Sequence, residues 1–277
     1  MVWNDLKTQQ CKELVENLVQ NKAHEGNPSG LKLNSEFVTS LFQERGFSVV
    51  RVPNPDAPYR PILIATSSSN PNRPTVGFFS HYDVEDAQPS EWGTDPWSLN
   101  ELNGRWYGRG VADNLVPLAQ RILLSDEMSK YCNLVFILQG EEEIGSPYAM
   151  KMYPSLDLPP IDMWVEETGY FYKNGNHRIM AVNVNQKLES VIDEIVKLNT
   201  SLGMETKVRV RPMNKAFGNQ GCPCLVHLLK DVPYIALGPN DDHSTIHGID
   251  ESIDPSMLRP SAQHLMKALE VLASGSI

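Results

Sequence analysis

Histidine and acidic residues occur in three short clusters of this chain, each beside an apolar segment or a glycine-rich turn. Imidazole nitrogen and carboxylate oxygen are ligands that zinc prefers, and a hydrolytic zinc site also keeps one position open for water beside a base. Residues of these types could therefore build a centre that activates water. The clusters contain His81 and Asp83, Asp113, and Glu142 and Glu143.

Apolar runs precede these clusters and indicate the strands that would position them. In an open α/β sheet, ligands bind beyond the carboxyl ends of the strands. Two further runs lead to Glu166 and to the pair His243 and His247. One such cluster alone is also typical of a surface turn, but four strand ends with compatible groups favour a shared site. The four runs span residues 75–79, 133–138, 161–165 and 232–237.

The acidic run from Glu141 to Glu143 has two interpretations. Adjacent carboxylates repel one another unless water or a cation neutralises them, and most acidic runs are solvated surface. This run follows a predicted buried strand, and Gly145-Ser146 after it could start a helix. We therefore favour a bound metal over a solvated turn.

Strand-like runs alternate with segments whose apolar residues have helical spacing, at 6–18, 188–198 and 257–272. The 277 residues, 41% of them hydrophobic, are enough to build one large core. The pattern predicts an α/β fold with a mainly parallel sheet and helices on both faces. We interpret residues 1–277 as one domain.

Charge and composition exclude several classes of partner. The net charge of −10 argues against binding to nucleic acid. No apolar run is long enough to span a membrane and no secretory leader is recognisable, so we expect a cytoplasmic protein. The four cysteines do not suggest a disulfide framework in a chain of this size, and Cys222-Pro-Cys224 is more typical of a packed turn than of a metal site.

In their order and spacing, these residues resemble the M20 metallopeptidases and deacylases, the family of acetylornithine deacetylase and succinyl-diaminopimelate desuccinylase. The resemblance covers much of the chain and is highly specific. It rests on His81-x-Asp83-Val84, Trp92-Gly-Thr-Asp-Pro-Trp97, Asn103-Gly-Arg-Trp-Tyr-Gly-Arg-Gly110, Asp113, Glu142-Glu143-x-Gly-Ser146 and His247-Gly-Ile-Asp-Glu251.

The resemblance implies two divalent metal ions, zinc first, with cobalt or manganese as alternatives. Asp113 would bridge the two ions, and its peptide bond to Asn114 would be cis. Asp83 would orient one imidazole ligand, and Glu142 would be the general base. The implied metal ligands are His81, Asp113, Glu143, Glu166 and His247.

Members of this family normally carry a second domain inserted after the strand that ends at Glu166. Here the short segment 173–186 stands in its place, so we expect no inserted lid and no dimer through it, and a monomer fits. The insert of the family supplies a histidine that polarises the substrate carbonyl. His177 and His243 are candidates for that role, although both are also typical of solvated loops.

The resemblance thus implies a two-metal amidohydrolase that cleaves an amide of a peptide or an N-acyl amino acid through metal-activated water. One alternative is a lidless relative that performs acyl transfer or amide formation in a biosynthetic pathway. Another is a metal-binding scaffold without turnover, against which the intact base Glu142 argues. Arg109, Arg209 and Arg211 are candidates to hold a substrate carboxylate, and the sequence does not choose among them.

Overall fold

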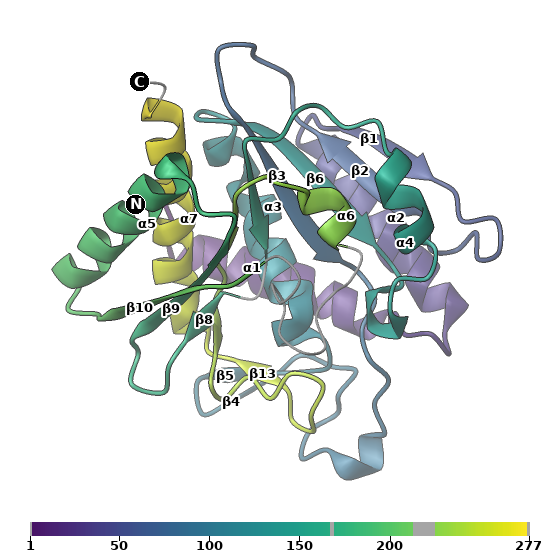
Figure 1. Cartoon of the computed structure of the whole chain (residues 1–277). Helices are drawn as coiled ribbons and strands as arrows, with labels where there is room; N and C mark the ends of the chain where they lie inside the picture. Colours follow the sequence, from purple (N-terminus) through teal and green to yellow (C-terminus); the bar gives the residue numbers. More distant parts are fainter. Residues whose placement is uncertain (1, 167–168, 213–224, 276–277) are drawn as a thin grey trace.

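The computed structural model describes residues 2–166, 169–212 and 225–275, and within these residues a ten-stranded sheet forms the centre of the molecule (Figure 1). In order across the sheet, the strands are β1 (Ser48–Val52), β2 (Ile62–Thr66), β6 (Asn133–Gln139), β3 (Thr75–His81), β7 (Met163–Glu166), β11 (Tyr234–Ala236), β9 (His177–Val182), β8 (Tyr170–Phe171) and β12 (Asn240–Asp241), with β10 (Thr206–Val210) paired to β9.

The four central strands β6, β3, β7 and β11 run parallel to one another. Parallel strands buried on both faces are apolar along their whole length, which explains the continuous apolar runs of the sequence. β2 joins β6 and β9 joins β11 in antiparallel fashion, so the sheet is mixed outside its parallel centre. The carboxyl ends of the four central strands therefore meet at one edge.

Alternate residues of the strands divide the interior into two hydrophobic cores. Phe78 and Phe136 stack with ring centroids 4.7 Å apart in the larger core, whereas Phe79 and Ile137 belong to the smaller one. The helices of the larger core are α1 (Asp5–Gln20), α2 (Pro28–Glu44), α3 (Val116–Met128), α5 (Gln186–Ser201) and α7 (Leu258–Ser274); those of the smaller are α4 (Ala149–Met152) and α6 (Leu225–Leu229). The predicted α/β fold with helices on both faces is confirmed.

Three helices begin where an asparagine side chain accepts a backbone N–H that the helix cannot satisfy itself. Asn4 accepts from Lys7 before α1, and Asn185 accepts from Leu188 before α5, each at 3.0 Å. Asn27 performs the same role before α2, which has proline at its first position. These caps explain why the apolar helical patterns start where they do.

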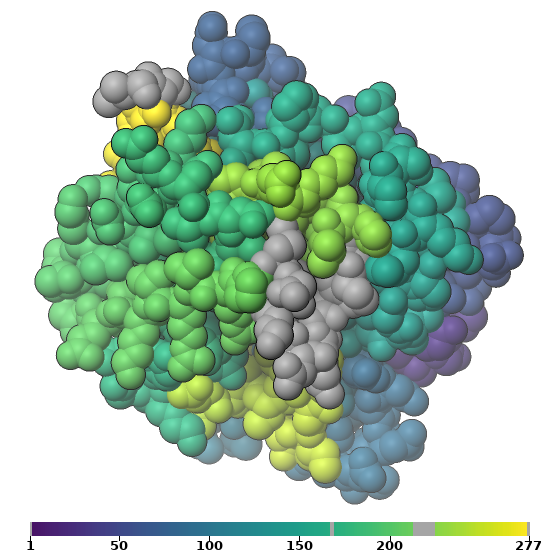
Figure 2. Space-filling view, viewed as in Figure 1, coloured from purple at the N-terminus to yellow at the C-terminus, as the bar shows by residue number. Residues whose placement is uncertain are grey.

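Residues 170–186 run from β8 through a turn into β9 and reach α5 at Gln186. On the face shown in Figure 2, the green segments of β9, α5 and β10 lie on one side, the teal segment that contains α4 lies on the other, and α6 lies between them at the top. The predictions of a single domain and of a missing lid remain predictions. Within the described ranges, no helix combines the length and the apolar character that a membrane span requires.

A small second sheet lies beside the carboxyl edge of the central strands. Its order is β13 (Ser252–Ile253), β5 (Arg105–Tyr107) and β4 (Asn100–Leu102), with antiparallel pairing. This sheet holds together two segments that are distant in sequence. They are the loop leading to Asp113 and the segment that follows His247.

Candidate metal centre

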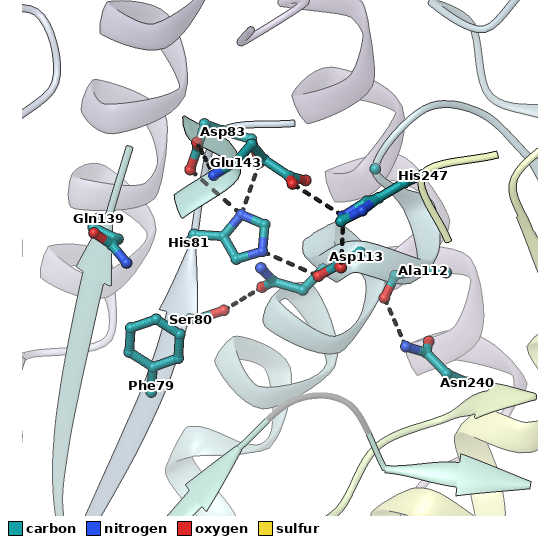
Figure 3. A network of polar contacts seen from close by, with 12 residues as sticks. Phe79, Ser80, His81, Asp83, Ala112, Asp113, Gln139, Glu143, Asn240 and His247 are labelled. Carbon is teal, nitrogen blue, oxygen red and sulfur yellow. Dashed lines mark hydrogen bonds and ion pairs between the residues drawn. The ribbon is translucent and has the colours of Figure 1, made fainter. Parts of the chain in front are cut away.

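Four of the five predicted ligands meet at the carboxyl edge of the parallel strands (Figure 3). His81 is the last residue of β3, and its Nε2 lies 3.1 Å from Oδ1 of Asp113. His247, in the loop between β12 and β13, places its Nε2 3.3 Å from Oδ2 of Asp113 and 3.0 Å from Oε2 of Glu143. The carboxylate of Asp113 thus lies between the two imidazoles.

The spacing of these atoms suits a cation. One ligand atom from each of His81, Asp113 and Glu143 lies within 4.8 Å of the others, and so does one from each of Glu85, Glu143 and His247. Ligand atoms lie about 2.0–2.2 Å from zinc, so two ligands of one ion are separated by at most about twice that distance. The separations of 3.0–3.3 Å that join His81, Asp113, Glu143 and His247 are inside that limit, so these residues fit a divalent metal ion.

Asp83 contacts two of the candidate ligands, His81 and Glu143, without belonging to the ligand-spaced groups. Nδ1 of His81 lies 2.9 Å from the backbone oxygen of Asp83 and 3.4 Å from its carboxylate. The other carboxylate oxygen accepts the backbone N–H of Glu143 at 3.1 Å. A proton on Nδ1 leaves the Nε2 lone pair of His81 directed at the centre, so Asp83 acts as a positioning residue.

Glu251 fixes the loop that carries Asp113. One of its carboxylate oxygens accepts the backbone N–H groups of Ala112 and Asp113 at 2.8 and 3.1 Å. The other accepts the N–H of Gly110 at 2.9 Å and the guanidinium of Arg109 at 3.0 Å. Because Glu251 is 1% exposed, this is an internal ion pair that shapes the site.

Two further hydrogen bonds hold the same loop. Asn240 donates to the backbone oxygen of Ala112 at 2.9 Å, and Ser80, beside His81, donates to the side-chain oxygen of Asn114. The peptide bond between Asp113 and Asn114 is cis, as the resemblance implies. The position of Asp113 is therefore set by contacts from β3, from β12 and from Glu251.

The pKa values of these groups are shifted by burial and by their contacts with one another. Hydrogen bonds to Asp113 and Glu143 raise the pKa of His247 to about 11. Burial opposes the charging of His81, but its contacts with Asp113 and Asp83 hold its pKa well above the usual range. Burial also raises the pKa of Glu143 to about 7, an effect larger than the opposing contact with His247.

For Asp113, burial acts to raise the pKa, but the hydrogen bonds from His247 and His81 outweigh it and the pKa is lowered. In the absence of a cation, the two imidazoles stay protonated because the neighbouring carboxylates favour positive charge. A divalent cation would supply the charge and displace the imidazole protons.

Two predicted site residues, Glu166 and Glu142, lie outside both ligand-spaced groups. Glu166 is buried at the end of β7, and its backbone oxygen accepts a hydrogen bond from Arg121 at 2.6 Å. Its carboxylate belongs to neither of the ligand-spaced groups found among the described residues. Glu142 begins a short 3-10 turn next to Glu143. Their roles as ligand and base remain predictions.

One acid of the run has a structural role, and one interpretation of the sequence is wrong. Glu141 is buried, and one of its carboxylate oxygens accepts the N–H groups of Tyr148 and Ala149 at 2.6 and 2.7 Å, so it holds the start of α4. His177 is neither a solvated loop residue nor an oxyanion donor. Its ring is fully buried and stacks on His264 at 4.2 Å.

Other candidates are placed differently. His243 is exposed in the loop before His247. Arg109 pairs with Glu251 through one guanidinium nitrogen and also lines the cavity that contains His247, and Arg209 lies exposed on β10. Cys222 and Cys224 lie outside the described residues.

Three residues of the site were missed. Glu85 lies four positions after His81 and was visible as a further acid in the same cluster. Glu251 ends the motif that begins at His247, but the sequence predicted no function for it. Arg121, the only charged residue in the first half of α3, is 1% exposed and donates to backbone oxygens near the strand ends.

Known proteins share this sequence pattern over part of the chain. The Beta-Ala-His dipeptidase of Mus musculus is 42% identical over 95 residues, a match that covers 32% of this chain and 19% of that enzyme. The Cysteinylglycine-S-conjugate dipeptidase of Corynebacterium striatum is 34% identical over 116 residues, covering 40% of this chain and 25% of that enzyme. The chain thus matches about a quarter or less of the length of these relatives.

Solved structures share the fold. Human carnosine dipeptidase 1 superposes with a TM-score of 0.73 at 13% identity, over 98% of both chains. An M20 family metallo-carboxypeptidase from Sulfolobus solfataricus superposes with a TM-score of 0.69 at 15% identity, over 98% of this chain and 100% of that one. The profile of peptidase family M20/M25/M40 matches residues 77–271, which is more than half of the sequence. The chain therefore belongs to peptidase family M20/M25/M40.

Proposed function

We propose that this protein is a metal-dependent hydrolase that cleaves the amide bond of a dipeptide or an N-acyl amino acid, with two divalent ions in its site. The observation that carries the proposal is the meeting of His81, Asp113, Glu143 and His247 at ligand spacing. Family membership and the dipeptidase names of the relatives support the choice of an amide substrate. Zinc is the first candidate metal, with cobalt or manganese as alternatives.

The residues would divide the work as follows. Asp113 would bridge the two ions, with His81 and Glu166 completing one set of ligands and Glu143 and His247 the other. When bound, such ions polarise a carbonyl and lower the pKa of water. Glu142 would accept a proton from the attacking water and return it to the leaving amine, while Asp83 and Glu251 keep the imidazole and Asp113 in place.

We also propose that the site works without an inserted lid and that the chain does not dimerise through one. The direct passage from the β8–β9 hairpin to α5 supports this. A site without a lid excludes less water and buries less substrate, so affinity for small substrates should be weak. Free, buried thiols at Cys11 and Cys132 are compatible with the cytoplasmic location that we predict.

Metal analysis and a substrate screen test the function together. Reconstituted protein should contain two equivalents of zinc, cobalt or manganese and should hydrolyse at least one dipeptide or N-acyl amino acid. Product analysis with and without an added amine acceptor separates hydrolysis from acyl transfer. Protein that retains only traces of metal after reconstitution would remove the basis of the proposal.

The base is tested by Glu142→Gln. The amide keeps the size of the side chain but cannot take a proton, so turnover should fall by about 10²- to 10⁴-fold while the metal content stays unchanged. Glu91→Gln is a matched control, because Glu91 is an exposed acid that lines a neighbouring cavity of about 250 Å³. Near-normal turnover in Glu142→Gln would show that another group is the base.

A further inference from the structure

Glu85 occupies a position at the site to which the family resemblance gives no role. It lines a cavity of about 160 Å³ together with Asp83 and Glu143. One of its carboxylate oxygens lies within 4.8 Å of ligand atoms of Glu143 and His247. In the described part of the chain, its carboxylate forms no hydrogen bond or ion pair with another residue.

The other acids of this cavity differ from Glu85 in that each forms a direct pair with a basic side chain. Glu25 pairs with the guanidinium of Arg60, and Asp86 lies 3.6 Å from Nδ1 of His24. Glu85 instead lies within 4.8 Å of both Glu143, a carboxylate of the same sign, and His247, and it forms an ion pair with neither. Two carboxylates this close are unfavourable unless a cation lies between them or a proton is shared.

The two ligand-spaced groups overlap at Glu143 and differ in depth. The group of His81, Asp113 and Glu143 is the inner one, and His81 is 1% exposed. The group of Glu85, Glu143 and His247 is the outer one, and the side chain of His247 is 50% exposed. One imidazole and two carboxylates are ligand types that zinc binds.

We propose that Glu85 is a protein ligand of the outer metal ion. This inference rests on the proposed metal-dependent function and adds a ligand that the family pattern does not predict. Glu85 would neutralise charge on the open side of the ion, where the inner ligands do not reach. The outer ion would therefore be held by Glu85, Glu143 and His247 in addition to the bridging carboxylate of Asp113.

The proposal is tested on metal-free protein by titrating Co²⁺ or Zn²⁺ against a chromophoric chelator of known affinity. Wild type should bind two ions, and Glu85→Gln should bind the weaker one at least about tenfold less tightly. The Co²⁺ absorption spectrum of that ion should also change, because a carboxylate ligand is lost. Asp86→Asn is the matched control, since it removes the same charge from the same cavity outside both ligand-spaced groups.

The outcomes separate this inference from the proposed function. If wild type binds no metal, the function itself fails. If wild type binds two ions and Glu85→Gln matches Asp86→Asn in affinity and spectrum, the role of Glu85 as a ligand is wrong and the function stands. A raised KM for peptides with a free amine, without a change in metal affinity, would likewise overturn the ligand role and indicate a substrate contact.

Folding of the variants is checked by thermal unfolding in excess chelator, where Glu85→Gln and wild type should unfold at similar temperatures. Glu85→Asp provides a second variant in case the amide does not fold. It keeps the charge but withdraws the carboxylate by one methylene, so it should also weaken the outer ion. Wild-type affinity in Glu85→Asp together with Glu85→Gln would contradict the proposal.

Discussion

Replacing Glu251 by glutamine should damage both the stability of the protein and its metal site. The carboxylate of Glu251 uses both oxygens, one for Ala112 and Asp113 and the other for Gly110 and Arg109. A glutamine amide has one oxygen and one NH₂ group. In either orientation, its NH₂ group would face two buried donors that lose their acceptor.

The expected loss of stability follows from the two buried donors that lose their acceptor. A buried donor without a partner costs about 1–3 kcal/mol, so two of them cost about 4 kcal/mol. Breaking a buried ion pair by removing one partner costs a similar amount, about 3–5 kcal/mol. Each kcal/mol lowers Tm by about 2 °C in a chain of this size, so Tm should fall by about 8 °C.

Glu141→Gln is the matched control for stability. Glu141 is also a buried carboxylate that accepts two backbone N–H groups, but both bonds go to the same oxygen. A glutamine can keep that oxygen in place and loses only the longer contact of the other oxygen with Nε of Arg60, at 3.8 Å. Glu141→Gln should therefore cost less than Glu251→Gln. The two variants therefore compare the same chemical change with and without the loss of two acceptors.

Thermal unfolding of metal-free protein measures the stability, and a competition titration with a chelator measures metal affinity. Because Glu251 holds the backbone of Asp113, Glu251→Gln should also weaken metal binding at least about tenfold. Equal Tm values for the two glutamine variants, within about 2 °C of wild type, would refute the argument from paired acceptors. Normal metal affinity in a destabilised Glu251→Gln would refute the positioning of Asp113.

Three further predictions concern the core and the ligands. Burial lowers the pKa of His177 to about 3, so stability present above its unfolded pKa of about 6.5 should be lost as pH falls, by about 2 kcal/mol at pH 5. In urea unfolding of metal-free protein at pH 7 and pH 5, His177→Phe should show a loss smaller by about that amount, and equal losses would contradict this. Asp113→Ala should be the most damaging ligand change, losing both ions in elemental analysis, and retention of either ion would contradict its bridging position. Metal at about 100 times its Kd should raise the free energy of unfolding by about 2.7 kcal/mol per ion, as measured in urea; an unchanged midpoint would argue against binding to the folded state.

The strands of the site could be predicted from the sequence because buried parallel strands are apolar throughout. The runs at 75–79 and 133–138 became β3 and β6, and the run at 161–165 became most of β7. Their parallel pairing then places the following residues at one edge. The approach of His81 to Asp113 follows from this arrangement, together with the loop that precedes α3.

The acidic run shows where local pattern is insufficient. Glu141, Glu142 and Glu143 are adjacent and chemically alike, yet Glu141 caps α4 and Glu143 contacts His247. Which carboxylate points where depends on the turn after β6, including the left-handed conformation of Gly145. The local sequence therefore does not distinguish the structural role of Glu141 from the site role of Glu143.

His177 was misjudged for a different reason. The sequence around it, Asn174-Gly175-Asn176, is typical of a turn, and a turn does form there, with Gly175 at a positive φ. The burial of His177 comes from distant partners. Asn199 of α5 donates to its Nδ1 at 3.2 Å, and His264 of α7 stacks on its ring. Contacts between segments so far apart leave no local signal.

Arg121 shows how the fold and the site depend on the same contacts. Its guanidinium donates to the backbone oxygens of Phe79, Glu166 and Leu237 at 3.2, 2.6 and 2.9 Å, within two residues of the carboxyl ends of β3, β7 and β11. A buried cation is tolerated when it is hydrogen-bonded, and strand-end carbonyls need donors. Because α3 follows directly after the loop of Asp113, the same side chain fixes the strand that ends at His81 relative to the helix that continues from Asp113. The spacing of the candidate ligands is therefore maintained by the packing of α3 on the sheet, and it does not rely on flexible loops alone.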